Sequence, residues 1–172
     1  MKVVNILFLD IDGPICNERS YYAYEQDKHK CVFRSWDPLS VRLIDRLCID
    51  YKLKVVISST WRKIHDVPTI LQTYGFRGEF HPCDKTPMKF SRAGRGTEIK
   101  EWLIDHKDNY PNEHIGKVLI IDDEDSGGDI YYETAQLDLK PYAVFSDTDD
   151  GFGYRDYKKS IQILKKKFDI SL

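Results

Sequence analysis

Two aspartates, Asp10 and Asp12, stand between an apolar stretch and a glycine. The apolar stretch at 3–9 lacks strict alternation, which is typical of a strand that is buried on both faces of a parallel sheet. Gly13 then allows the backbone to turn sharply. Two carboxylates at the end of a buried strand are costly unless a cation or hydrogen bonds hold them. One of them could attack a phosphoryl group while the other handles protons, although Asp-Gly after a strand is also a common structural turn.

A pair of hydroxyl groups follows the second apolar stretch, at 53–57. Ser58 and Ser59 could cap a following helix, which is an ordinary structural role for serine at such a place. Alternatively, a hydroxyl and free backbone amides at the start of a helix form a site for an anion such as phosphate. The segment taken alone favours neither interpretation.

Acidic residues end the third apolar stretch, at 117–121. Asp122 and Asp123 begin a run of acids that could be a surface loop, but neighbouring carboxylates repel one another unless a cation lies among them. Mg²⁺ fits such a site, because proteins hold it by one or two carboxylates together with waters and substrate phosphates. No histidine or cysteine lies in these motifs, which disfavours zinc.

Strand-like and helical stretches alternate along the chain, which favours an α/β fold with a three-layer, Rossmann-like parallel sheet. Parallel strands bring their carboxyl ends to one edge of the sheet, where ligands bind in open α/β folds. The three motifs would therefore meet at one site, and chance produces all three together much less often than any one alone. The expected elements are strands at 3–9, 53–57, 117–121 and 142–145 and helices at about 37–51, 62–75, 99–106 and 157–168.

The remaining stretches are expected to be irregular. Residues 14–36 are polar and rich in aromatic side chains, and we interpret them as a flap over the two N-terminal aspartates. Residues 76–94 are expected to be loop-like, with at most one short strand near 78–80. The 172 residues fit a single domain, 1–172, in which the flap is an insertion.

Composition and charge argue against several classes of protein. Hydrophobic residues make up 41% and charged residues 31%, which is a globular rather than a disordered balance. The net charge of −2 gives no overall attraction to nucleic acid, and no apolar run is long enough to span a membrane. The first residues are typical of a strand rather than of a signal peptide. The sequence has four separated cysteines and no CxxC pair: Cys16, Cys31, Cys48 and Cys83. This pattern argues against structural zinc and a disulfide scaffold, so we expect a reduced, cytoplasmic setting.

The motifs together resemble those of the haloacid dehalogenase-like (HAD) superfamily of phosphatases. The resemblance rests on 10–13 (Asp-Ile-Asp-Gly), 55–58 (Val-Val-Ile-Ser) and 119–123 (Leu-Ile-Ile-Asp-Asp), in this order. Two further segments, 58–62 and 95–103, are similar to small HAD domains that are common in phages and bacteria. Those domains are related to the HAD domains of RNA-repair proteins and to polynucleotide kinase-phosphatases. The resemblance covers nearly the whole chain and implies a HAD-like fold and a Mg²⁺-dependent phosphatase activity.

Carried over to this sequence, the resemblance implies a role for each motif residue. Asp10 would be the nucleophile and a magnesium ligand. Asp12 would protonate the leaving oxygen and then activate water against the aspartyl-phosphate, and its backbone carbonyl would contact the metal. Ser58 would bind a phosphoryl oxygen, and Asp122 and Asp123 would complete the magnesium site.

The superfamily also uses a cation, usually a lysine, to balance the charge of the phosphate. Arg95 is the first candidate here, since an arginine can grip two phosphate oxygens, and Lys85 and Lys89 are alternatives. Each of these could equally be an ordinary solvated cation. The candidate substrate-binding residues are Ser59, Arg62, Lys85 and Lys89.

The interval between the first two motifs is too short for the inserted cap domain that often selects small substrates in this superfamily. It contains one helix and about twenty residues of flap, which is the size of a long loop. Pro14, where the superfamily usually has threonine or valine, would stiffen the hinge of this flap. An open site would admit bulky phosphomonoesters, including nucleotides or the end of a nucleic acid.

Basic and aromatic side chains near the motifs could contact such a substrate, because bases stack on aromatic rings. A solvated basic loop beside ordinary aromatic packing is the structural alternative. The residues concerned are Lys85, Lys89, Phe90, Arg92, Arg95, Tyr21, Tyr22, Tyr24 and Trp61.

Two functions of other classes are alternatives to a phosphatase. A phosphorylation-dependent signalling domain, like a response-regulator receiver, also combines a parallel sheet, clustered acids and Mg²⁺. Receivers, however, place the acid pair and the phosphorylated aspartate on different strands, whereas Asp10 and Asp12 share one strand end here. The second alternative is a catalytically silent HAD-like module that binds without turnover.

Overall fold

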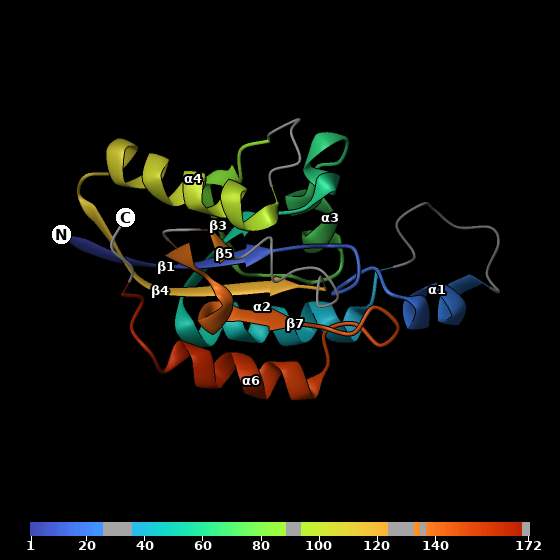
Figure 1. Cartoon of the computed structure of the whole chain (residues 1–172). Coiled ribbons are helices and arrows are strands. Elements are labelled where there is room, and N and C mark those ends of the chain that lie inside the picture. Colours follow the sequence, from blue (N-terminus) through green and yellow to red (C-terminus); the bar gives the residue numbers. More distant parts are fainter. Residues whose placement is uncertain (26–35, 89–93, 124–132, 135–136, 170–172) are drawn as a thin grey trace.

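Five parallel strands form the centre of the structure, a computed structural model that describes residues 1–25, 36–88, 94–123, 133–134 and 137–169 (Figure 1). The strand order is β3-β2-β1-β4-β7, so β1, which leads into the two aspartates, lies in the middle. The strands are β1 (Lys2–Leu9), β2 (Leu53–Ile57), β3 (Glu79–Lys85), β4 (Glu113–Asp122) and β7 (Ala143–Phe145). Two short strands form a separate antiparallel pair, β5 (Glu133–Thr134) and β6 (Leu137–Asp138). The predicted parallel α/β sheet is therefore confirmed.

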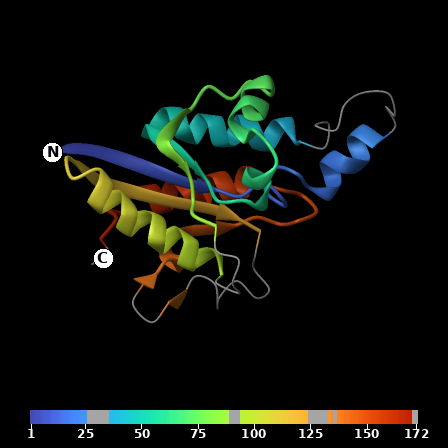
Figure 2. The same cartoon turned by 90° about the horizontal axis from the view of Figure 1, so that it is seen from above.

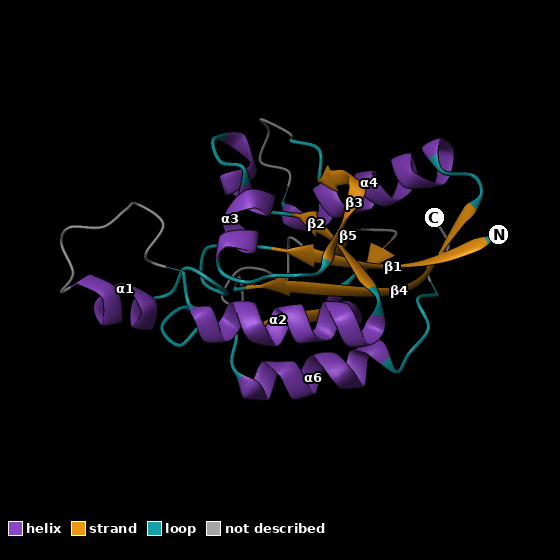
Figure 3. Cartoon of the chain, turned by 180° about the vertical axis from the view of Figure 1, so that it is seen from behind, coloured by secondary structure: helices purple, strands orange, loops and turns teal. Residues whose placement is uncertain are grey.

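Helices cover both faces of this sheet and give it three layers. Helices α2 (Pro38–Tyr51) and α6 (Tyr154–Leu164) lie side by side on one face, and α4 (Arg95–Asn109) lies on the other (Figure 3). The remaining described helical segments are α1 (Glu18–Glu25), α3 (Val67–Thr73) and the 3₁₀ turns η1 (Thr60–Lys63) and η2 (Lys140–Tyr142). In the part of the chain that the structure describes, no helix is both long and apolar enough to cross a bilayer.

The side chains of β1 enter two separate hydrophobic clusters, one on each face of the sheet. Leu7 and Leu9 belong to the cluster beneath α2 and α6, whereas Ile6 and Phe8 belong to the cluster beneath α4. All four are completely buried, and the ring of Phe8 meets that of Trp102 edge-on at 5.2 Å. Burial on both faces explains why the strand is apolar without alternation.

Asp37 begins α2 and also holds the base of the predicted flap. As the N-cap of α2 it accepts a hydrogen bond from the backbone N–H of Leu39 at 2.9 Å. Its other oxygen accepts from the Ser40 hydroxyl at 3.2 Å and from the Asn17 amide at 3.4 Å, and it pairs with the guanidinium of Arg19. Pro38 at the first helical position agrees with the predicted helix start.

The edge strand β3 is longer than the sequence predicted for this region. Residues 76–94 were expected to be loop-like, but Glu79–Lys85 forms a seven-residue strand beside β2. Pro82 cannot donate to a ladder, and the register shifts between the pairs Val55–Phe80 and Ile57–Lys85. An edge position and a shifted register are the conditions under which a strand tolerates proline.

The helix predicted at 62–75 is interrupted. The 3₁₀ turn η1 ends at Lys63, and α3 begins anew because Asp66 caps it and Pro68 occupies its first turn. Gly75, with φ of 84°, follows the end of α3 as predicted. Leu39, which shares the helical spacing of Leu43 and Leu47 in the sequence, is 50% exposed.

The described part of the predicted flap contains the helix α1, which was expected to be irregular. Figures 1 and 2 show α1 standing out beyond the carboxyl ends of β1 and β4. Its first turn is held to a loop of the C-terminal half, since the N–H of Arg19 donates to the carbonyl of Asp149 at 2.9 Å. Pro14 accepts a hydrogen bond from the N–H of Phe152 at 2.9 Å, so the hinge is anchored there too. Residues 26–35 of the flap lie outside the described residues.

Candidate active site

The sheet ladder continues past the strand ends and fixes the residues that follow them. Four such residues donate a backbone N–H to the last carbonyls of the neighbouring strand, so their positions follow from the parallel topology. These bonds run from Asp10 to Ile121 at 2.9 Å, from Ser58 to Leu9 at 2.8 Å, from Thr86 to Ile57 at 3.1 Å and from Ser146 to Asp122 at 2.8 Å. The predicted convergence of the motifs at one edge of the sheet is therefore present.

Three carboxylates meet at this edge. Asp10, Asp122 and Asp123 each offer an oxygen, and these oxygens lie within 4.8 Å of one another. Asp10 and Asp122 are almost completely buried. One oxygen of Asp10 accepts from the N–H of Ile11 at 2.6 Å, and one oxygen of Asp122 accepts from the N–H of Asp123 at 2.8 Å. The remaining oxygens are held close together with little water around them.

Arg95 supplies positive charge to this cluster from the first turn of α4. Its guanidinium lies 3.4 Å from Asp10 Oδ2 (Nη2) and 3.7 Å from Asp122 Oδ2 (Nε). A third contact, 3.3 Å from Nη1 to Glu98 Oε2, orients the side chain within the helix. The structure thus brings together Asp10 and the first candidate for the cation.

Arg62 is buried behind Arg95 and is engaged by protein groups. Its Nη2 lies 2.8 Å from Glu98 Oε2 and 3.3 Å from the carbonyl of Pro87, and its Nη1 donates to the carbonyl of Ser59. Glu98 therefore bridges Arg62 and Arg95. This placement favours a supporting role for Arg62 over the substrate contact that the sequence suggested.

Burial and a neighbouring charge raise the pKa of Asp10. Burial raises the pKa of Asp10 well above its ordinary value, and the nearby charge of Asp122 raises it further. Arg95, a hydrogen bond from the Ser59 side chain and the N–H of Ile11 oppose this rise only in part. A nucleophile must be ionised, so Asp10 requires additional positive charge beside it.

The cluster fits a divalent cation of the magnesium type. Its donors are carboxylate oxygens, which are the ligands that Mg²⁺ prefers. Burial and, after it, the negative charge of Asp122 raise the pKa of Asp10, and a dication would offset both effects. The carboxylate of Asp12 is not part of the cluster; the resemblance assigned it a metal contact only through its backbone carbonyl.

Two buried hydroxyls lie at the same edge of the sheet. Neither Ser58 Oγ nor Thr86 Oγ1 has a hydrogen-bond partner among the described residues, although the two residues are only 1% and 3% exposed. A buried hydroxyl without a partner is unfavourable unless a ligand completes its hydrogen bonding. For Ser58 this agrees with the expected contact to a phosphoryl oxygen.

A cleft of about 470 Å³ opens beside Asp12. The side chain of Asp12 accepts a hydrogen bond from Trp61 Nε1 at 2.6 Å, and Tyr21 and Tyr22 of α1 are 54% and 65% exposed. The cleft is lined by Asp12, Gly13, Cys16, Asn17, Glu18, Tyr21, Tyr22, Trp61 and Thr148. Three of the aromatic residues that the sequence pointed to are therefore grouped next to one of the two N-terminal aspartates: Tyr21, Tyr22 and Trp61.

Lys85 is placed less favourably than Arg95. It is exposed at the end of β3, where its charge lowers the pKa of Asp66. Lys89, Phe90 and Arg92 lie outside the described residues, as does the side chain of Tyr24. The expected basic surface near 85–97 is therefore represented by Lys85 and Arg95.

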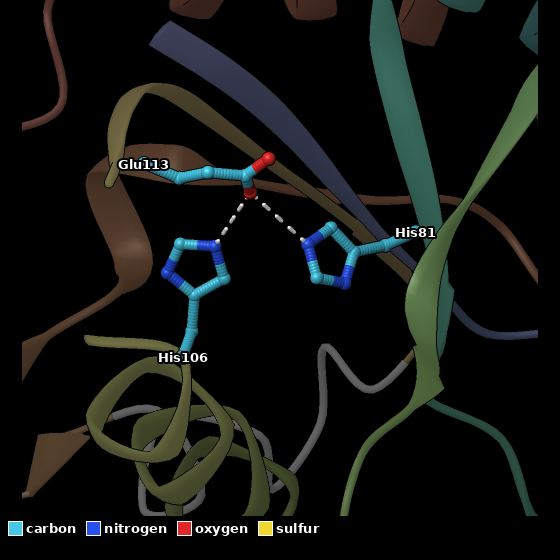
Figure 4. A group of neighbouring side chains, drawn as sticks. All are labelled: His81, His106 and Glu113. Carbon is cyan, nitrogen blue, oxygen red and sulfur yellow. Dashed lines mark hydrogen bonds and ion pairs between the residues drawn. The ribbon is translucent and has the colours of Figure 1, made fainter. Parts of the chain in front are cut away.

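A second group of titratable side chains lies elsewhere in the fold. Figure 4 shows His81 of β3 and His106 of α4 pointing toward the same oxygen of Glu113, at the start of β4, with distances of 3.5 Å and 3.3 Å to Nε2. His81 Nδ1 accepts the N–H of Cys83 at 3.0 Å, so the proton of the neutral ring is on Nε2. A metal at Nε2 would need this proton moved to Nδ1, against the Cys83 N–H. We therefore interpret the group as a polar clasp between three elements, in which His106 hydrogen-bonds Glu113 and His81 lies 3.5 Å from the same oxygen.

Sequence reasoning missed three residues of the candidate site. Thr86 was not identified because the strand expected near 78–80 was predicted to end well before Lys85, and only the position of a hydroxyl directly after a strand could have pointed to it. Glu98 was not assigned a role, although its spacing of three residues from Arg95 places both on one side of a helix. Trp61 was considered for stacking but not for a hydrogen bond to Asp12.

Comparison with known proteins identifies the family. A family described as "HAD domain in Swiss Army Knife RNA repair proteins" matches residues 6–154, which include the three carboxylates of the cluster, Ser58 and Arg95. No match was found among curated proteins or among solved structures. The HAD family indicates a hydrolase with phosphatase-type activity. Because the match spans most of the sequence, this chain belongs to the family of HAD domains of Swiss Army Knife RNA-repair proteins.

Proposed function

We propose that the protein is a Mg²⁺-dependent phosphomonoester hydrolase that forms an aspartyl-phosphate on Asp10 and acts on nucleotides or on the terminal phosphates of polynucleotides. The observation that carries this proposal is the meeting of Asp10 with two further carboxylates and with Arg95, at 3.4 Å, on one edge of the sheet. Asp10, Asp122 and Asp123 would hold Mg²⁺, which when bound would neutralise their charge and that of the phosphoryl group.

In the first half of the proposed reaction, a carboxylate oxygen of Asp10 attacks the phosphorus atom. The bond between phosphorus and the leaving oxygen breaks, and Asp12 gives its proton to that oxygen. The guanidinium of Arg95 and the hydroxyl of Ser58 bind the phosphoryl oxygens, whose charge they stabilise. The products are the free alcohol and the aspartyl-phosphate.

In the second half, water cleaves the aspartyl-phosphate. Asp12, now a carboxylate, removes a proton from the water as its oxygen attacks phosphorus, and the bond to the Asp10 oxygen breaks. Inorganic phosphate leaves, Asp10 is again a carboxylate and Asp12 is again protonated, so the cycle is closed. The same residue serves as acid and then as base because the two halves are nearly mirror images of each other.

The cleft beside Asp12 supports a nucleotide or polynucleotide end as the substrate. The leaving alcohol must be next to Asp12, and the walls there carry Tyr21, Tyr22 and Trp61. Aromatic rings of this kind stack on bases with little dependence on sequence. The RNA-repair context in the family description points to the same class of substrate.

Phosphate release from p-nitrophenyl phosphate tests the proposed chemistry. We expect release with Mg²⁺, its loss with a chelator and its loss in Asp10→Asn, whereas Asp105→Asn, an exposed position on α4, should stay active. An active Asp10→Asn protein would refute the role of Asp10. A phosphorylated Asp10 that persists for hours would instead favour a receiver-like signalling role, and Mg²⁺ binding without turnover would favour a silent binding module.

A turnover screen addresses the substrate class. It compares 5′- and 3′-phosphorylated nucleotides and oligonucleotides with sugar phosphates of similar charge. We expect kcat/KM to be higher for the nucleotides, and we expect replacement of both Tyr21 and Tyr22 by alanine to reduce that advantage. Equal rates for sugar phosphates and nucleotides would argue against the aromatic cleft as a base-binding site.

A further inference from the structure

The side chains of Trp61 and Asp12 are joined across two strand ends. Asp12 lies in the turn after β1, and Trp61 lies in η1, shortly after β2. The indole Nε1 of Trp61 donates to Asp12 Oδ1 at 2.6 Å. The indole N–H of Trp61 therefore holds one of the two oxygens of the Asp12 side chain.

The indole ring is fixed by contacts on several sides. It meets the completely buried ring of Trp36 edge-on, with centroids 5.5 Å apart, and lies 4.6 Å from the ring of His65. The backbone N–H of Trp61 donates to the Ser59 hydroxyl at 3.3 Å, which anchors the turn. The donor thus has a defined position, whereas Asp12 itself is exposed and could otherwise rotate.

We propose that Trp61 is a positioning residue that sets which oxygen of Asp12 transfers the proton. An indole N–H can only donate, so it engages Oδ1 as an acceptor in both halves of the reaction. The proton is therefore carried on Oδ2, the oxygen left to face the leaving group and later the water. This inference rests on the proposed acid and base role of Asp12.

The consequence depends on how much the leaving group needs a proton. An alkyl phosphate such as a nucleoside monophosphate releases a strongly basic alkoxide unless Asp12 protonates it, whereas p-nitrophenolate leaves readily without help. The ratio of kcat/KM for the two substrates isolates this step, because kcat/KM covers only events up to departure of the alcohol. A purely structural role of Trp61 would lower both values together.

Trp61→Phe keeps an aromatic ring and removes the N–H. We expect kcat/KM to fall about tenfold for the alkyl phosphate, the loss associated with one hydrogen bond to a charged group. For p-nitrophenyl phosphate we expect a fall of no more than about twofold, since proton transfer contributes little there. Trp102→Phe is the matched control, because it also removes an indole hydrogen bond, to the carbonyl of Cys83 at 3.0 Å, on another part of the fold; its ratio should equal that of the wild type.

A double-mutant cycle gives a second test that does not depend on comparing substrates. In an Asp12→Ala background, Trp61→Phe should have no further effect on the residual cleavage of the alkyl phosphate. Equal losses on both substrates, or an undiminished effect of Trp61→Phe without Asp12, would overturn the inference while leaving the phosphatase assignment intact. If the wild type releases phosphate from neither substrate, it is the proposed function that fails.

Discussion

Gly13 and Asp123 approach each other so closely that a β-carbon on Gly13 would lie 2.3 Å from the β-carbon of Asp123. The two residues follow different strands, β1 and β4, and Gly13 has φ of 81°, a conformation that other residues rarely adopt. The glycine is thus required twice, for the turn after the aspartates and for the space that the third carboxylate of the cluster occupies.

Gly13→Ala is therefore expected to damage both stability and the acidic site. We expect the free energy of unfolding in urea to fall by about 3 kcal/mol or more, from backbone strain together with overpacking. Mg²⁺ binding, measured by calorimetry, should weaken because Asp123 is displaced.

Gly75→Ala is the matched control, since Gly75 has φ of 84° but no atom within 4 Å of the place that an added methyl group would take. This substitution should cost about 1–2 kcal/mol and leave Mg²⁺ binding unchanged. Similar effects of both substitutions would show that the contact with Asp123 is unimportant.

Arg95 should have opposite effects on turnover and on metal binding. Its guanidinium is 3.4 Å from Asp10 and 3.7 Å from Asp122, so we expect it to stabilise a bound phosphoryl group and to repel a metal ion. Arg95→Ala is expected to lower kcat/KM about 10²–10³-fold, as for the loss of one group that stabilises the transition state. Mg²⁺ affinity in calorimetry should rise. A larger loss of turnover in Lys85→Ala than in Arg95→Ala would transfer the role of the cation to Lys85.

The clasp of His81, His106 and Glu113 should make stability depend on pH. Burial lowers the pKa of both histidines below 6.5, and the carboxylate of Glu113 offsets this only in part. The unfolded chain therefore takes up these protons at a higher pH than the folded protein. The contribution to stability is complete above about pH 6.5 and is lost as the pH falls through the lower folded-state values.

Urea unfolding between pH 8 and pH 5 measures this dependence. We expect the free energy of unfolding to decrease below about pH 6.5 in the wild type, and the decrease should be smaller in His81→Gln and in His106→Gln. Other groups that act on the rings are Lys2, which lies 3.0 Å from the second oxygen of Glu113, and the ring of Tyr110. If the free energy of unfolding decreased with falling pH as steeply in both variants as in the wild type, the clasp would not titrate in this range.

The stabilisation that Asp37 gives to α2 should be lost at acidic pH. Burial alone would raise its pKa, but hydrogen bonds from Arg19, the N–H of Leu39 and Asn17 bring the pKa below its usual value. The stabilisation is therefore present at neutral pH and is lost as the pH falls through this lowered pKa. Asp37→Asn should unfold at lower urea concentration at pH 7, and the difference from wild type should shrink toward pH 2. Asp50→Asn, which breaks an exposed ion pair of the same helix with Arg46 at 2.7 Å, should leave the urea midpoint almost unchanged.

The sequence was sufficient for those parts of the site that follow from a strand and the residues directly after it. The buried stretches ending at Leu9, Ile57 and Ile121 are distinct, and parallel pairing alone brings Asp10, Ser58 and Asp122 to one edge. The edge strand β3 was predicted only as a short strand near 78–80, because Pro82 and several polar residues obscure the rest of its pattern. Thr86, which depends on that strand, was missed for the same reason.

Contacts between distant elements were beyond the reach of local patterns. Arg62 was expected to contact substrate, yet whether it faces solvent or Glu98 depends on how η1 packs against α4. The clasp of His81, His106 and Glu113 likewise draws on three elements that show no shared spacing. In both cases the partner is chosen by tertiary packing, which a single sequence does not display.

The central position of β1 has a consequence for how the chain is made in the cell. One neighbour of β1, the strand β2, leaves the ribosome soon after it, but the other neighbour is β4, and the ion pair between Lys2 and Glu113 joins residues 111 positions apart. Until β4 emerges, one edge of β1 lacks its neighbouring strand and is exposed to water or to a chaperone. Synthesis that stalls before Asp122 would consequently yield an aggregation-prone fragment lacking two of the three clustered acids.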